Sequence, residues 1–151
     1  MKRSQYIDLI CMLLILLFGY ASTSKLVEYD TFRLQLGQSP FISSFAPILT
    51  WAVPAVELLA VTLLIPARTR LSGLYISLFL MTLFSAYIYA MLHYSFYIPC
   101  SCGGILEKLD WKDHLYLNLG FLALILTGIY LDGAHSRASE PGHVSQKTAS
   151  A

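Results

Sequence analysis

The chain has 151 residues, of which 56% are hydrophobic and 13% are charged, and its formal net charge is +1. Soluble domains average about 45–50% apolar and about 25% charged residues, so this composition excludes an ordinary soluble domain and predicts a protein that sits in a lipid bilayer. The small net charge gives no support for nucleic-acid binding.

Four apolar stretches are long enough to cross a bilayer as helices, for which about 17–25 residues suffice. They cover residues 6–24, 45–65, 71–96 and 113–131. We therefore predict an all-α fold, a four-helix transmembrane bundle over residues 1–131. Residues 132–151 are small and polar without apolar periodicity, which predicts a disordered polar tail.

The first stretch also has features of a signal peptide. The basic residues of Met1-Lys2-Arg3 precede an apolar core, and the small residues Ala21 and Ser22 follow it; this order is typical of cleaved leaders. We favour a retained transmembrane helix, because the apolar stretch is long enough to span and three further spans follow it.

A mixed connector, residues 25–44, lies between the first two spans. Apolar residues alternate there with charged ones such as Glu28, Asp30 and Arg33. The pattern fits either a short helix at the membrane interface or an extended loop. Gly37 and Ser39-Pro40 should end it, because glycine and X-Pro steps interrupt regular structure.

Lysine and arginine residues predict the orientation. With four spans, the N-terminus, the short turn at 66–70 and the tail fall on one side and hold six basic residues, whereas the other side holds four, diluted by acidic residues. The positive-inside rule then predicts that both termini are cytoplasmic and that the segment between the third and fourth spans lies outside.

Two of the three cysteines lie in that outer segment, within Ile98-Pro99-Cys100-Ser101-Cys102-Gly103-Gly104. In a bent backbone, cysteines one residue apart can reach the roughly 4.4–6.8 Å Cα separation of a disulfide, and strained, exposed disulfides exchange readily. The motif indicates a dithiol/disulfide centre that exchanges with a partner. Two alternatives stay open: a Cu(I) site, since soft thiolates bind that ion, and a structural link.

Glu57 is the clearest ionisable residue inside a predicted span. Such residues are costly in a membrane and are by default candidates for a functional site. The alternative is a structural hydrogen bond to Ser85, Thr82 or a tyrosine. Asp8, near the cytoplasmic interface, and Cys11, inside the first span, are predicted to be structural, with Cys11 a small buried apolar residue.

Two histidines flank the cysteine segment. His93 is near the end of the third span, and His114 is near the start of the fourth, with Asn118 one turn further along the same face. Either histidine can lower the pKa of a cysteine or carry a proton. The alternative for each is an interfacial residue in contact with water and headgroups.

A longer pattern resembles a known family. Tyr97-x-Pro-Cys-Ser-Cys-Gly-Gly104, followed by Leu109-x-Trp111-x-x-His114-x-x-x-Asn118, is similar to the methylamine-utilisation MauE family, in the MauE/DoxX-like group. Gly19-Tyr-Ala-x-x-x-Lys25, Leu36-x-x-Ser39-Pro40 and Pro54-x-x-Glu57-Leu58 extend the resemblance. It covers most of residues 10–131.

The resemblance implies a multi-pass protein of the bacterial inner membrane whose cysteine motif faces the periplasm. It also implies a part in the maturation of disulfide-containing periplasmic proteins, beside thioredoxin-like partners. Vitamin K epoxide reductase and DsbB are similar in layout and use a quinone, so a quinone cofactor stays open here. This chain departs from them, because it has one outward cysteine pair and they have two.

We therefore predict a membrane thiol–disulfide redox component with Cys100, Cys102, His114 and Glu57 as its site residues and no metal. Cys100 is the predicted attacking thiolate. The alternatives are a non-enzymatic assembly or scaffold subunit, whose cysteine segment docks a partner, and a copper-handling membrane protein.

Overall fold

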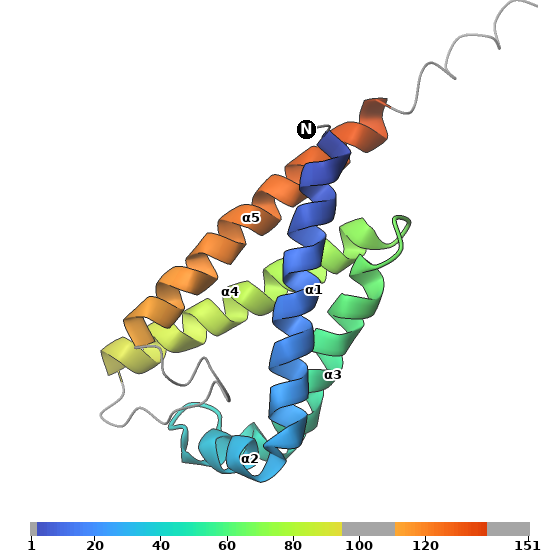
Figure 1. Ribbon diagram of the computed structural model, residues 1–151. Helices are drawn as coiled ribbons and strands as arrows, with labels where there is room; N and C mark the ends of the chain where they lie inside the picture. Colours follow the sequence, from blue (N-terminus) through green and yellow to red (C-terminus); the bar gives the residue numbers. More distant parts are fainter. Residues whose placement is uncertain (1–2, 95–110, 139–151) are drawn as a thin grey trace, which may run out of the picture.

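The computed structural model describes residues 3–94 and 111–138, and every regular element in these ranges is a helix (Figure 1). In chain order the elements are α1 (Arg3–Val27), α2 (Tyr29–Gln38), the short 3-10 helix η1 (Ser43–Phe45), α3 (Ala46–Leu64), α4 (Arg70–Tyr94) and α5 (Trp111–Ala138). Four segments are long and apolar enough to cross a membrane: Ser4–Val27, Ser43–Leu64, Arg70–Tyr94 and Lys112–Gly133. The predicted all-α fold with four membrane-spanning helices is confirmed.

The four long helices form a ring. α1 packs against α3 and α5, and α4 packs against the same two helices, so that α1 and α4 lie diagonally opposite each other. α2 crosses one end of the bundle and packs on α3 (Figure 1); we call this the α2 end. The start of α1 and the last turns of α5 lie at the opposite end (Figure 1), which we call the terminal end.

α5 continues beyond the predicted end of the fourth span. The helix runs to Ala138, so residues 132–138 are helical where the sequence predicted a polar tail without structure. The physical reason is that extending an existing helix costs little, and no proline interrupts the chain before Pro141.

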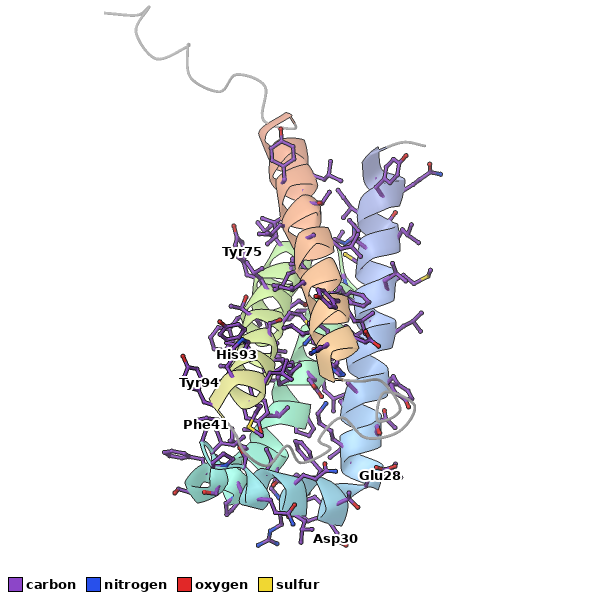
Figure 2. The ribbon with its side chains drawn as sticks, turned by 90° about the vertical axis from the view of Figure 1, so that its left-hand side faces the viewer. Glu28, Asp30, Phe41, Tyr75, His93 and Tyr94 are labelled. Carbon is purple, nitrogen blue, oxygen red and sulfur yellow. The ribbon has the colours of Figure 1, made fainter. Side chains whose placement is uncertain are left out.

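α2 is the short helix that was one of the two predictions for the connector. Phe32 and Leu36, one turn apart, are buried against Ala46 at the start of α3. Glu28 and Asp30 point away from the bundle at the α2 end (Figure 2). The helix ends at Gln38 because Ser39 is extended, and the Tyr87 hydroxyl donates to Ser39 Oγ at 3.0 Å, which ties α4 to the end of α2.

The interior of the bundle is apolar, and so is much of its outer surface. Cys11 is only 3% exposed in the main core, as predicted for a small buried residue. Large apolar side chains are exposed on all four long helices, among them Leu16, Ile48, Phe79 and Leu126. Apolar surface on this scale is the usual sign of a membrane or protein interface, and here it lies on helices of spanning length.

At the terminal end, Arg70 Nη1 lies 3.0 Å from Asp8 Oδ1. This ion pair joins the start of α4 to the first turns of α1. The contact is consistent with the structural role predicted for Asp8, which stays a prediction because the Asp8 side chain is 55% exposed.

Candidate functional site

A cavity of about 440 Å³ lies toward the α2 end and is lined by residues from α1, α2, α3, α4 and α5. Its walls are mainly apolar and aromatic. The polar side chains on the walls are Lys25, Glu57, Tyr87, His114 and Asn118. An apolar pocket with a few convergent polar groups is the usual form of a small-molecule site in proteins.

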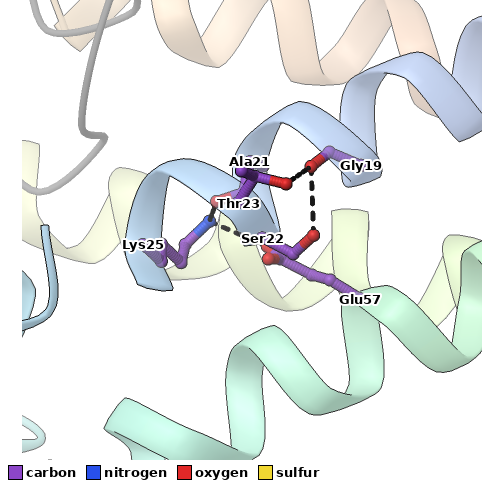
Figure 3. Close-up of polar contacts among 6 residues, drawn as sticks. All are labelled: Gly19, Ala21, Ser22, Thr23, Lys25 and Glu57. Atoms are coloured by element: carbon purple, nitrogen blue, oxygen red, sulfur yellow. Dashed lines mark hydrogen bonds and ion pairs between the residues drawn. The ribbon is translucent and has the colours of Figure 1, made fainter. Parts of the chain in front are cut away.

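Lys25 and Glu57 form an ion pair in this cavity, with 2.8 Å between Lys25 Nζ and Glu57 Oε1 (Figure 3). The Glu57 side chain is 1% exposed and that of Lys25 is 13% exposed. Lys25 Nζ also donates to the Ala21 carbonyl at 3.3 Å and lies 5.9 and 5.8 Å from the ring centroids of Phe32 and Phe84. The ammonium group is thus held between a carboxylate and two aromatic rings, within cation–π range.

The partners that the sequence suggested for a structural Glu57 are engaged elsewhere. Ser85 Oγ donates to the Met81 carbonyl at 2.7 Å, and Thr82 Oγ1 donates to the Leu78 carbonyl at 2.7 Å. Both hydroxyls bond back to their own helix, a common arrangement for serine and threonine inside helices. The hydrogen-bond partner of Glu57 is instead Lys25, which reaches it from the end of α1.

Two buried polar atoms on the cavity wall have no hydrogen-bond partner among the described residues. They are the second carboxylate oxygen of Glu57, Oε2, and the side-chain amide nitrogen of Asn118, Nδ2. Buried polar atoms are nearly always hydrogen-bonded in native proteins. These two atoms therefore mark a place where a water or a polar group of another molecule could supply the missing hydrogen bonds.

The two histidines have different positions. His114 lines the cavity, one turn before Asn118 on α5. His93 lies on the outer side of α4 (Figure 2), where its ring stacks on Tyr89 with 4.2 Å between centroids and its Nδ1 hydrogen-bonds the Tyr89 carbonyl at 3.1 Å. Of the two candidates, only His114 is on the cavity wall.

Cys100 and Cys102 lie outside the described residues. The segment that contains them joins Tyr94, at the end of α4, to Trp111, at the start of α5. Both helix ends lie toward the α2 end of the bundle (Figure 1). The cavity and the two attachment points of the cysteine segment are therefore in the same half of the molecule.

Lys25 is the site residue that sequence reasoning missed. In the sequence it stood out only as the first residue of the connector, as one of the four basic residues on the outer side, and as part of the family pattern. A signal was present: a carboxylate within a membrane span calls for a nearby cation, and Lys25 stands at the end of a neighbouring span.

Residues 3–131 match a family model described as "Methylamine utilisation protein MauE". The matched region contains all the polar residues of the cavity wall and both cysteines of the predicted motif. No curated protein and no solved structure matches the chain. Because the family model covers most of the chain, this multi-pass membrane protein belongs to the MauE family.

Proposed function

We propose that the protein is a thiol–disulfide exchange component of the bacterial inner membrane and that Cys100 and Cys102 form its reactive pair. The partner would be a periplasmic protein with a thioredoxin-like or other exchangeable disulfide. In this proposal both termini are cytoplasmic, so the α2 end, with the cysteine segment, faces the periplasm. Exchange with such a partner would support its disulfide formation or maturation.

The observation that carries the proposal is the common position of three features. The helix ends that hold the cysteine segment, the cavity and the Lys25–Glu57 pair all lie toward the α2 end. The segment runs directly into α5, whose first turn contains His114. Thiolates are stabilised by nearby cations and histidines, and Lys25 and His114 on the cavity wall are side chains of this kind.

The proposed reaction is a reversible transfer of two electrons. The thiolate of Cys100 attacks one sulfur of the partner's disulfide, so that a mixed disulfide forms and the other partner sulfur leaves as a thiolate. Cys102, once deprotonated, attacks the Cys100 sulfur and closes the Cys100–Cys102 disulfide. The partner leaves as a dithiol. Run in reverse, the same steps oxidise the partner. His114 is proposed to accept and return the thiol proton.

Trapping of the mixed disulfide tests the proposal. In a Cys11→Ala background, Cys102→Ser removes the resolving thiol. We therefore expect a covalent adduct with a periplasmic protein, and dithiothreitol should cleave this adduct by reducing the mixed disulfide. Cys100→Ser is the matched single variant: it removes the attacking thiol and should form less adduct than Cys102→Ser. The double serine variant should form no adduct and should lose function. Gel shift and mass spectrometry of the adduct provide the measurement.

The alternatives predict different results. A scaffold would bind its partner without covalent capture and would keep its function in the double serine variant, since serine is nearly isosteric with cysteine. A copper-handling protein would lose bound copper in each single variant and trap no protein. Either pattern would reject the thiol–disulfide proposal.

A further inference from the structure

We infer that the cavity between the helices binds the head of a neutral, lipid-soluble molecule that carries hydroxyl or carbonyl oxygens. The cavity and its walls alone support this binding. It does not require the cysteine pair, so it can be tested independently of the proposed exchange reaction.

The hydrogen-bonding pattern defines the head group. Glu57 Oε2 is an acceptor without a partner, and Asn118 Nδ2 is a donor without a partner, among the described residues. Leaving such buried groups without a hydrogen bond is energetically unfavourable. A ligand head that both donates and accepts would satisfy both atoms at once. A hydroxyl group both donates and accepts, and a hydroxyl beside a carbonyl offers the two functions on separate oxygens.

The charges of the cavity favour a neutral head. The carboxylate of Glu57 is already compensated by Lys25 at 2.8 Å, so the pair has no net charge. An anionic head, such as a phosphate, would be repelled by Glu57 and would compete for Lys25. A second cation would displace Lys25 from the carboxylate. Buried charges without a partner are strongly disfavoured, which selects against both.

The walls and the entrance suit a ligand that arrives through the bilayer. Three of the lining residues are themselves largely exposed on the outer surface: Phe45, Ile48 and Leu83. They lie on the membrane-spanning segments Ser43–Leu64 and Arg70–Tyr94, so the part of the lining that also faces outward on these two segments is apolar, and we infer that the ligand enters there. The volume of about 440 Å³ lies within the range of small-molecule sites, roughly 300–1,000 Å³.

Two classes of lipid-soluble molecule have such a neutral, hydroxyl-bearing head: hydroquinones and glycerides. Binding measurements on the full chain in lipid nanodiscs distinguish them. One probe is decylubiquinol, a hydroquinone, and the other is monodecanoylglycerol, a glyceride with free hydroxyls; decyl phosphate is the anionic comparator. We expect at least one neutral probe to bind saturably at one molecule per chain and at least ten-fold more tightly than decyl phosphate. The probe that binds more tightly identifies the source.

Variants locate the binding. Asn118→Leu removes an amide whose nitrogen has no hydrogen-bond partner among the described residues, so the fold should persist, and it should weaken binding at least ten-fold. Thr127→Val is its control, because Thr127 is on the same helix, bonds the Ala123 carbonyl and is outside the cavity. Ile48→Trp, at a position that is 67% exposed, should obstruct the entrance, whereas Ile65→Trp, exposed but away from the cavity, should have no effect.

Three results would overturn the inference. They are the absence of saturable binding by both neutral probes, equally tight binding of decyl phosphate, and unchanged binding in both Asn118→Leu and Ile48→Trp. In the nanodiscs, circular dichroism of each variant confirms that a loss of binding is not a loss of fold.

Discussion

The Lys25–Glu57 pair shows how one residue is tolerated in an environment that disfavours it. An ionised carboxylate in a membrane span is costly, and Glu57 is fully buried in α3. Lys25 compensates its charge from the end of α1, where the ammonium group still has 13% exposure. The pair thereby links two helices that are neighbours in the ring.

A double-mutant cycle tests this link. Glu57→Gln leaves the ammonium of Lys25 without its counter-charge, and Lys25→Met leaves the carboxylate buried and unpaired. We expect each single change to lower the free energy of unfolding by about 3 kcal/mol, the low end for breaking a buried ion pair, because Lys25 keeps some contact with solvent. Unfolding in mixed SDS micelles provides the measurement.

The double variant should lose clearly less than the sum of the two, with a coupling of at least about 1 kcal/mol, as is typical of residues in direct contact. Additive losses would show that the two charges do not stabilise each other. If the double variant regains stability but still forms no mixed disulfide, Glu57 and Lys25 also belong to the functional site. If the double variant regains both its stability and its formation of the mixed disulfide, Glu57 and Lys25 have a structural role alone.

Sequence identified Glu57 but not its partner, for a physical reason. The cost of a carboxylate in an apolar helix is a local property that can be seen in the sequence. The partner is 32 residues away, and α2 intervenes between the two helices. Its identity depends on how far α1 extends past the bilayer-length stretch, which hydropathy does not determine.

At the scale of elements, α4 approaches the backbone of α3 closely at Gly73. A Cβ added at Gly73 would lie 3.0 Å from the Leu64 backbone nitrogen and 3.1 Å from the Leu63 carbonyl carbon. Backbone atoms cannot move aside as a side chain can. Small residues that let helices approach closely are typical of packing in membranes, so Gly73 fixes how α4 returns along α3 after the turn at 66–69.

Gly73→Ala should therefore destabilise the bundle, although alanine is the better helix former by about 1 kcal/mol. Overpacking typically costs about 1–3 kcal/mol, and we expect the midpoint of thermal unfolding in detergent to fall by roughly 2–6 °C. Gly120→Ala is the matched control, because no atom lies within 4 Å of its added Cβ. That variant should be unchanged or more stable. An equal response of the two variants would contradict the proposed role of Gly73.

At the scale of the whole molecule, the ring of four helices brings both described ends of the chain to the terminal end (Figure 1). The number of spans could be predicted because length and apolarity set it. The order of helices around the ring could not, since it depends on which faces interlock, and the outer faces are nearly as apolar as the inner ones. The extent of the cavity could likewise not be predicted from the sequence, because residues from every described helix contribute to its walls.

The most direct test of the account is labelling of the cysteine pair in intact cells with a membrane-impermeant maleimide, in the Cys11→Ala background, where no other cysteine remains. The account predicts that Cys100 and Cys102 are modified from the periplasmic side and that dithiothreitol increases the labelling, because part of the population carries the disulfide. It would be contradicted if the pair is modified only after cell lysis, or if reduction leaves the extent of labelling unchanged.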